Sequence, residues 1–437
     1  MKKIGSGIYK LFFLVALGVI LSVGIYVFKS NPQAYKISAS EIEYKFESAN
    51  STQQSEFDFV KKKVESTGNP DLLDLASLAD LYVTEAKKTG NTAYYDKAEK
   101  LAQSILKQSL NQAIQLKSAH LTMVNVMTAR HQFKEALEKL DKIFGVQMSE
   151  DTAYPKALIY LALNKFDDAF AQINFLIKAK PSMATATLKA LVLSHVGQDD
   201  LAFHYFKRAI QLEDINENSQ SVLTRGQFAT FLIKKGQYAD AIKICDTALK
   251  IIPANNFIKH VKAQAYNAQK DYEKAYQLLS AAFAESKDPV YLLQMVYSLK
   301  LLNKENDFNI LTNQAIAIFK TEVELKNYGH LADLAGLYYV MGDDQNAIRT
   351  VMLDQESKKT LRTDLILAKA LIRTKKTEQA RDIVEGQIAK NSTDASLDYL
   401  MVEILNGNSN KNLREIYLSR AKAKNNKFNL DQMMKIP

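Results

Sequence analysis

The feature that most constrains the fold is a self-similarity with a period of 34 residues. When residues 236–253 are laid against 270–289, similar residues coincide in the pairs Tyr238/Tyr272, Ala241/Ala275 and Ala248/Ala282. Upstream of these segments, Ala229 coincides with Ala263 at the same shift. Apolar residues within each segment recur every three or four positions, which predicts helices with one buried face. A fixed period of this length indicates stacked helical hairpins.

Alanine follows the same period along most of the chain. It recurs in the predicted second helix of each hairpin at Ala98, Ala136, Ala169, Ala202, Ala241, Ala275, Ala347 and Ala380. Most steps lie between 33 and 39 residues, but the step of 72 to Ala347 predicts a hidden hairpin near residues 290–320. A further step of 33 reaches Leu413, where we expect a degenerate last hairpin. The fold class is therefore all-α, with an α-solenoid of about ten hairpins.

Turn residues agree with this frame. Glycines fall between the two helices of a hairpin, at Gly197, Gly236 and Gly342, and prolines follow the second helix, at Pro181, Pro253 and Pro289. No segment alternates apolar and polar residues for long enough to predict a strand. These observations exclude barrels, sandwiches and doubly wound sheets.

The period, the alanines and the turns resemble the tetratricopeptide repeat family. Two departures are that the family's large first-helix residue is never Trp and that the steps ending at Ala136 and Ala241 are stretched. The resemblance implies a right-handed superhelix whose first helices line a concave groove for peptides or partner domains. The Lys, Asn and Arg combination with which some members hold a C-terminal carboxylate is absent from the matching positions. The matching groove positions carry polar residues, suited either to an extended peptide backbone or to a solvated face: Asn125, Thr230, His260, Gln264 and Asn267.

An apolar segment near the N-terminus predicts a membrane anchor. Residues 11–28, LFFLVALGVILSVGIYVF, are close to the roughly 20 apolar residues that cross a bilayer as a helix. Lysines are denser before the segment than after it, which favours a cytoplasmic N-terminus. A cleaved secretory signal is the alternative, but no small-x-small cleavage site follows the segment. Gly18 and Ser22 have the spacing of small residues at which two membrane helices associate, so self-association stays open.

We therefore expect four parts in the chain. These are a cytoplasmic N-terminus with a single transmembrane helix (1–30), a polar stalk (31–70), a superhelical array (71–425) and a basic C-terminal tail (426–437). Ser38 and Glu41 have the spacing of a helix capping box within the stalk. Residues 410–437 carry seven Lys or Arg against two Asp or Glu, although the whole chain has a net charge of only +9. This end is either the polar cap of the solenoid or a contact for an anionic neighbour.

Chemical motifs are scarce. Cys245, the only cysteine, falls at a core position of the repeat, so neither a disulfide nor a thiolate metal site is expected. The six histidines are scattered, and the chain has no H-E-x-x-H, P-loop, G-x-S-x-G or dinucleotide fingerprint. We expect no enzyme activity, no metal and no cofactor. Basic residues are not interleaved with exposed aromatic residues, so nucleic acid is not an expected partner.

Together, the anchor and the array predict a protein–protein interaction scaffold with protein partners or extended peptides as ligands. The expected location is the inner membrane of a bacterium, with a single membrane pass and the array in the periplasm. There the protein would assemble an envelope complex for polysaccharide export, secretion or pilus biogenesis. Two alternatives stay open: a periplasmic chaperone that holds exported polypeptides, and an accessory subunit of a membrane enzyme complex.

Overall fold

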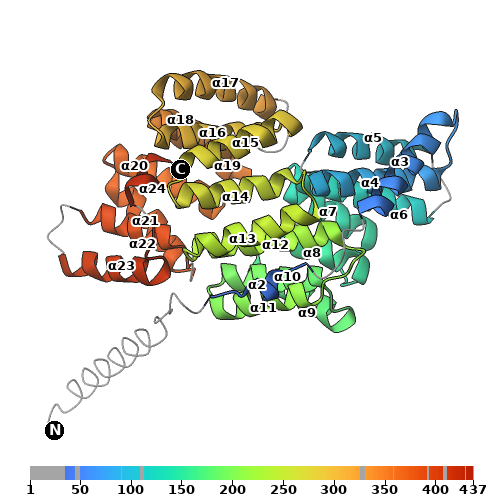
Figure 1. The fold of residues 1–437 in the computed structure, drawn as a ribbon, viewed down its shortest axis with the longest axis horizontal. Coiled ribbons are helices and arrows are strands. Elements are labelled where there is room, and N and C mark those ends of the chain that lie inside the picture. Colours follow the sequence, from blue (N-terminus) through green and yellow to red (C-terminus); the bar gives the residue numbers. More distant parts are fainter. Residues whose placement is uncertain are drawn as a thin grey trace, which may run out of the picture.

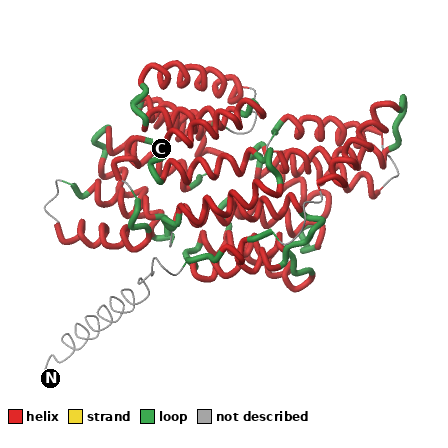
Figure 2. Tube along the Cα trace, in the orientation of Figure 1, coloured by secondary structure: helices red, strands yellow, loops and turns green. Residues whose placement is uncertain are grey.

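The computed structural model describes residues 35–436, with gaps at 45–49, 90, 109–112, 325–329, 358, 391–392, 407–410 and 429. Within these ranges every regular element is a helix, and α4 to α23 form ten consecutive hairpins (Figure 1, Figure 2). The first helices are α4 (Leu72–Thr89), α6 (Ala113–Ala129), α8 (Glu150–Ala162), α10 (Met183–His195), α12 (Asn218–Lys234), α14 (Asn256–Ala268), α16 (Pro289–Leu301), α18 (Leu331–Met341), α20 (Leu361–Arg373) and α22 (Ala395–Ile404). The second helices are α5 (Ala93–Gln108), α7 (Phe133–Phe144), α9 (Phe166–Ala179), α11 (Asp199–Gln211), α13 (Tyr238–Ile251), α15 (Tyr272–Ser286), α17 (Glu305–Glu324), α19 (Asp344–Ser357), α21 (Thr377–Ile388) and α23 (Lys411–Lys424).

The periodic alanines lie where the helices of a hairpin cross. All eight are fully buried in the second helices, where a larger side chain would hold the helices apart. The hidden hairpin is α16–α17, in which Ala315 takes the buried position, and α23 completes the tenth hairpin around Leu413. Cys245 is also fully buried, in α13, and burial raises the pKa of its thiol to about 12. The thiol is therefore a packing group.

The turn between the two helices of a hairpin uses the left-handed region of backbone space. In the second to ninth hairpins one residue there has a positive φ, and in three hairpins it is glycine, with φ of 80°, 72° and 90° at Gly197, Gly236 and Gly342. The other five hairpins use His131, Asn164, Lys270, Asn303 and Lys375. A non-glycine residue costs roughly 1–2 kcal/mol there, so the packing of each hairpin must offset that cost.

The array coils until its early and late hairpins touch. The Asn164 side chain, after α8, donates a 2.8 Å hydrogen bond to the carbonyl of Lys359, before α20. Lys235, after α12, bonds both Asp199 at 2.6 Å and Thr393, before α22, at 3.3 Å. In Figure 1, α22 and α23 accordingly lie beside the ends of α12 and α13. The concave side is thus closed by the chain itself.

A short segment upstream of the array, residues 35–44, lies against the fourth and fifth hairpins and contains α2 (Ala39–Ile42). The Tyr35 ring packs edge-on against Phe203 and Phe231, at centroid distances of 5.3 and 5.7 Å. Its hydroxyl donates to Asp200 at 3.0 Å. We call residues 35–44 the docked segment.

A buried arginine fixes the other end of the docked segment. Arg225 of α12 is fully buried, forms an ion pair with Glu213, and donates to the carbonyl of Ile42 at 3.2 Å. Its guanidinium also lies over the Tyr44 ring, and the Tyr44 hydroxyl bonds Asn218. The docked segment is therefore tied to the middle of the array at both ends.

These contacts correct the expectation of a stalk over residues 31–70, as far as that stretch is described. Besides the docked segment, α3 (Asn50–Ser66) packs on α4, with Phe57 against the Tyr82 ring at 5.5 Å and Lys63 paired with Asp74 at 2.6 Å. The reason is that isolated apolar residues in this polar stretch are buried by the array. The expected transmembrane segment, residues 11–28, lies outside the described residues, and none of the helices that are described has the length and apolar character to cross a bilayer.

Candidate binding groove

The inner face of the array is occupied by the end of the same chain. The groove segment, residues 425–428 and 430–436, contains α24 (Leu430–Lys435) and lies across first helices α14, α18 and α20. This corrects the expectation of a basic tail beyond the array at 426–437, at least for its described residues. Apolar side chains of the segment explain the difference: Met433 is buried, and Phe428 stacks on the Tyr399 ring at 5.0 Å.

The groove holds this segment through backbone carbonyls. The Tyr339 hydroxyl of α18 donates to the carbonyl of Met434 at 2.6 Å, and the Lys369 ammonium of α20 donates to the carbonyl of Ile436 at 3.2 Å. In the opposite direction, the Gln432 amide donates to the carbonyl of Asn267 at 3.0 Å. Because every polypeptide has these carbonyls, the contacts from Tyr339 and Lys369 do not depend on the side chains of the bound segment.

A single asparagine fastens the start of the groove segment. Asn425 is 3% exposed, and its amide donates to the carbonyl of Lys234 at 3.3 Å and to the Tyr238 hydroxyl at 3.4 Å. Its side chain lies directly against Gly236, in the turn between α12 and α13. Glycine is therefore required at this position for two reasons: the backbone has a positive φ, and Asn425 fills the space that a Cβ would need.

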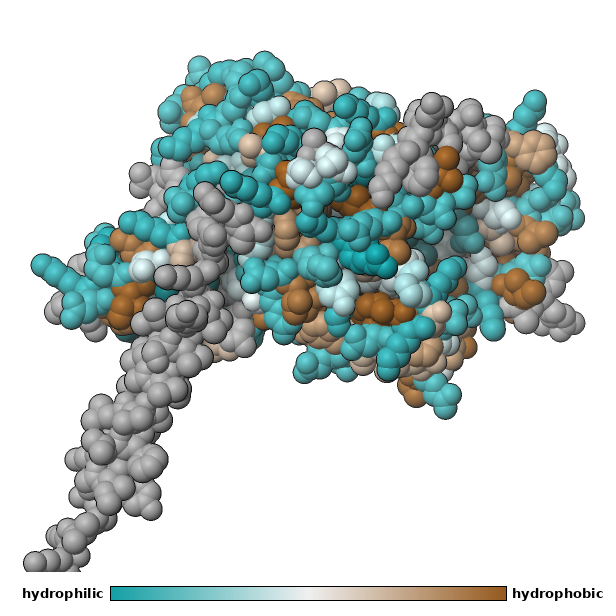
Figure 3. Space-filling view, turned by 60° about the horizontal axis from the view of Figure 1, so that its bottom comes forward, coloured by the Kyte–Doolittle hydropathy of each residue, from teal (hydrophilic) through white to brown (hydrophobic). Residues whose placement is uncertain are grey.

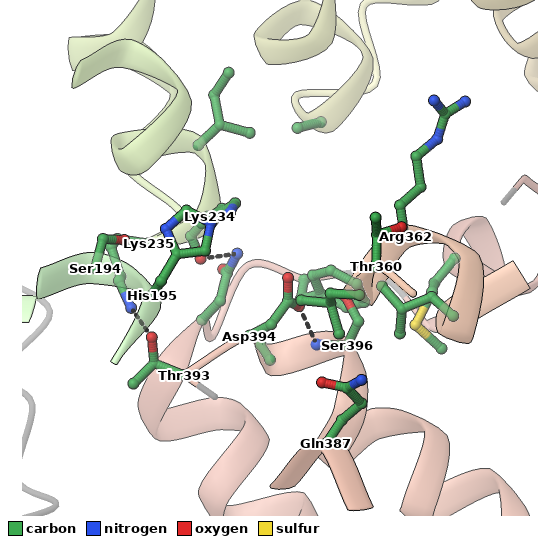
Figure 4. A pocket seen from close by; sticks show the side chains of 18 of the residues that line it. Ser194, His195, Lys234, Lys235, Thr360, Arg362, Gln387, Thr393, Asp394 and Ser396 are labelled. Atoms are coloured by element: carbon green, nitrogen blue, oxygen red, sulfur yellow. Dashed lines mark hydrogen bonds between the residues drawn. The ribbon is translucent and has the colours of Figure 1, made fainter. Parts of the chain in front are cut away.

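Beside the groove segment lies a cavity of about 930 Å³. Its walls come from the third to sixth hairpins, the ninth and tenth hairpins, and the groove segment itself. Figure 4 shows His195, Lys234 and Lys235 on one wall, facing Thr360, Arg362 and Asp394 on the other. The only carboxylate among the described lining residues is that of Asp394. Six cationic side chains line the cavity: Lys234, Lys235, Arg362, Lys369, Lys390 and Lys427.

The two buried lysines of the cavity have different surroundings. Burial lowers the pKa of Lys235, and the ion pair with Asp199 opposes this effect. Burial lowers the pKa of Lys369 to about 8, and only the more distant charge of Asp394 opposes it. No carboxylate of the described residues lies within ion-pair distance of Lys369. The cavity therefore contains one cation whose charge no carboxylate of the described residues balances locally.

A buried ionic network adjoins the cavity at Arg362. The Arg362 guanidinium pairs with buried Asp333 of α18 at 2.6 Å, and Asp333 also bonds His330 at 2.8 Å. Although burial opposes the shift, Arg362 and His330 hold the pKa of Asp333 well below its usual range. The pKa of His330 is raised, because Asp333 and then Glu322 outweigh the effect of burial. This network fixes Arg362 at the cavity wall, so that Arg362 is not a free cation.

The five residues expected at the groove do not form one site. His260, Gln264 and Asn267 share α14, where the Gln264 amide lies 3.0 Å from His260 Nε2. The Asn267 side chain is bonded to Ser298, and only its carbonyl meets the groove segment. Thr230 donates to the carbonyl of Gly226 within α12. Asn125, on α6, is half-buried. None of the five expected residues lines the cavity described above.

Sequence reasoning missed Tyr339 and Lys369, which hold the groove segment, and Asn425, which fastens its start. One signal was available for Lys369, because it interrupts the almost wholly apolar run LILAKALI in α20. A charged residue within such a run marks either a paired core residue or a site. Among the described residues, no group of three His, Cys, Asp or Glu side chains is arranged to hold a metal ion. The arrangement is suited to binding through hydrogen bonds, apolar contact and positive charge.

An array of helical hairpins around an inner groove defines a helical-repeat protein of the α-solenoid class. The profile of the tetratricopeptide repeat matches residues 232–294, from the end of α12 into α16. The chain is therefore a helical-repeat protein in which residues 232–294 match the tetratricopeptide repeat. No curated protein matches the sequence.

Solved structures of similar fold are distant in sequence. The human IFIT1 dimer with PPP-AAAA is 14% identical at a TM-score of 0.48, over 85% of this chain and 87% of that chain. The Cut9–Hcn1 hetero-tetramer of APC/C is 14% identical at a TM-score of 0.45, over 92% of this chain and 81% of that chain. Yeast Tom70 is 13% identical at a TM-score of 0.40, over 86% of this chain and 89% of that chain. At TM-scores below 0.5, nothing about binding follows from these three likenesses.

Proposed function

We propose that the protein is a membrane-anchored scaffold for protein–protein interaction, and that its groove accepts an extended polypeptide. The observation that supports this binding mode is the chain's own groove segment, held through the carbonyls of Met434 and Ile436 by Tyr339 and Lys369. A partner peptide would use the same two donors after the groove segment leaves. Competition for shared contacts would make partner binding dependent on release of the segment.

The proposed location rests on the sequence. Residues 11–28 serve as the anchor, and the denser lysines before them favour an array outside the cytoplasm, in a bacterial periplasm. A scaffold placed there would assemble an envelope complex for polysaccharide export, secretion or pilus biogenesis. In this proposal any chemistry lies in a partner, which includes the case of an accessory subunit of a membrane enzyme complex.

The surface favours a scaffold over a holding chaperone for unfolded chains. A holding chaperone needs a contiguous apolar patch, but the large apolar residues exposed in the described part are dispersed over separate elements, for example Phe59 on α3, Ile114 on α6, Ile310 on α17 and Met352 on α19. On the face drawn in Figure 3, apolar areas are likewise separated by hydrophilic ones.

Membrane topology is tested with a single introduced cysteine. Val146 is 77% exposed in the turn after α7, whereas the native Cys245 is fully buried with a pKa raised to about 12. In intact cells, a membrane-impermeant maleimide should label Val146→Cys but not the wild-type chain. Labelling of Val146→Cys only after lysis would place the array in the cytoplasm and overturn the proposed topology.

Partners are tested by proximity labelling from the same turn. The labelling enzyme is inserted at Val146, because a fusion at the end of the chain would disturb the groove segment. Enrichment of envelope-assembly proteins, relative to the enzyme fused to residues 1–34 alone, is the expected result. Enrichment of many unrelated exported chains would instead support the chaperone, and no enrichment over the control would contradict both functions.

A further inference from the structure

The cavity beside the groove segment has the size and lining of a small-molecule site. Its volume of about 930 Å³ falls within the range of roughly 300–1,000 Å³ that is typical of ligand pockets. Most of the remaining wall is apolar, and it comes from three separate parts of the array and from the groove segment: Leu161, Phe166, Ile233, Leu361, Leu365, Phe428, Met433 and Ile436. Closure of the superhelix creates this cavity, so that it does not exist in any single hairpin.

Lys369 differs from the other buried cations of the described chain. Five Lys or Arg residues are buried there, and four of them pair with a carboxylate: Lys156 with Asp141, Arg225 with Glu213, Lys235 with Asp199 and Lys259 with Glu285. Lys369 is 3% exposed, and within the described ranges its bonding partner is the neutral carbonyl of Ile436. It also lines the cavity.

An ammonium in an apolar wall is unfavourable for the empty protein when no carboxylate of the described residues pairs with it. Removal of a charge from water costs several kcal/mol unless a counter-charge or several hydrogen bonds replace the water. One neutral carbonyl at 3.2 Å supplies only part of this. An anion in the cavity would supply the missing counter-charge, and an apolar body attached to it would be buried by the surrounding side chains.

We propose that this cavity binds a small amphipathic anion, with its apolar body against the hydrophobic wall and its single anionic group on Lys369. A carboxylate or a phosphate would satisfy this chemistry, as in a fatty acid or a lysophospholipid. One anionic group suffices, because Lys235 and Arg362 already have carboxylate partners, while Lys234, Lys390 and Lys427 are exposed. The site adjoins the proposed polypeptide groove and shares Lys369 with it, but the cavity is present while the groove segment is in place.

The experiment uses the full chain in cell membranes, where detergent cannot compete for the cavity. Two probes with a photoreactive group on the alkyl chain, a fatty acid and a lysophosphatidic acid, are cross-linked to the chain, and the labelled peptides are mapped by mass spectrometry. We expect labels on cavity residues such as Leu161 and Leu365. Labelling by one probe or by both identifies the source of the anionic group, and a photoreactive methyl ester of the same fatty acid should label the cavity far less.

Variants test the role of the charge. Lys369→Met, which keeps the length and apolar stem of the side chain, should reduce cavity labelling by about tenfold or more, the loss typical of a charge-assisted contact. Lys369→Arg should keep most of the labelling, and Lys320→Met, at an exposed position outside the cavity, should keep all of it. Absence of cavity labels with both probes, or equal labelling of a folded Lys369→Met variant, would overturn the proposal. Partner enrichment in the proximity experiment is measured separately, so failure of one proposal is distinguishable from failure of the other.

Discussion

Gly236 and Asn425, from the fifth hairpin and the end of the tenth, are in direct contact, and the Asn425 side chain fills the space that a Cβ on Gly236 would need. The same asparagine bonds the carbonyl of Lys234 and the hydroxyl of Tyr238. This contact thus links closure of the superhelix to binding of the groove segment. Substitution of Gly236 affects both at once.

The first prediction is that Gly236→Ala releases the groove segment. The new methyl group would collide with Asn425, in addition to the cost of roughly 1–2 kcal/mol for a positive φ. Limited trypsin digestion should therefore cut after the exposed Lys427 several times faster than in the wild type.

Gly342→Ala is the matched control for this variant. Gly342 has a φ of 90°, but nothing lies within 4 Å of the position that an added methyl group would take, so only the backbone cost applies. Equal cleavage after Lys427 in the two variants would mean that Asn425 does not hold the segment.

A second prediction concerns the buried ion pair beneath the docked segment. Arg225→Met leaves Glu213 buried without its partner, which typically costs about 3–5 kcal/mol, and removes the donor to Ile42. Hydrogen exchange measured by mass spectrometry should become faster in α12 and in residues 35–44. Arg381→Met removes an exposed pair with Glu378 and should change exchange very little, because such pairs contribute about 0–1 kcal/mol.

A third prediction uses pH. Burial, and then the charge of Arg362, lowers the pKa of His260 to about 4, below the usual value of 6.5. The unfolded chain therefore binds more protons than the folded chain between these values, and this histidine destabilises the fold as the pH falls from 6.5 towards 4. His260→Gln should remove roughly 1–2 kcal/mol of that acid-induced loss between pH 7 and pH 5, measured by urea unfolding at both pH values.

His330 should give a pH effect of opposite sign. Its pKa is raised, so its stabilising contribution is complete below 6.5 and is lost as the pH rises through the folded-state pKa. His330→Asn should therefore lower stability more at pH 5 than at pH 8. If both histidine variants showed the same pH dependence as the wild type, the opposite environments assigned to these residues would be wrong.

A fourth prediction compares two glycines inside helices. A methyl group on Gly226 of α12 would overlap the Phe257 ring and lie 2.9 Å from Ile258, whereas nothing lies within 4 Å of the same position on Gly386 of α21. Gly226→Ala should therefore lower the thermal midpoint by forcing α12 and α14 apart. Gly386→Ala should raise it slightly, because alanine is the better helix former by about 1 kcal/mol. A higher midpoint for Gly226→Ala would contradict the close packing of α12 on α14.

The hairpins could be predicted from the sequence, but the closure of the array could not. Alanines such as Ala241 and Ala275 report a local crossing that recurs with a fixed period, and such a period is visible in one sequence. Closure depends instead on single polar residues, Asn164, Thr393 and Asn425, that meet residues far away in the chain. No periodicity marks such residues.

The candidate site was harder to predict for a related reason. Asn125, Thr230 and Asn267 were all predicted as groove residues because each lies in a first helix. Of these three, only Asn267 contacts the groove segment. Which first helices face the groove follows from the superhelix and from the segment that fills it. Lys369 could have been selected by chemistry instead, as a charge in an apolar helix.

The docked segment also decides how the array would stand on a membrane. Seven peptide links separate Phe28, the end of the proposed anchor, from Tyr35, and a fully extended chain of that length spans at most about 25 Å. Because Tyr35 is held by Phe203 and Phe231, the anchor would attach near the middle of the array and not at one of its ends. The fourth and fifth hairpins would be nearest the lipid, and α3 to α6 would project sideways as an arm that neighbouring complexes could reach.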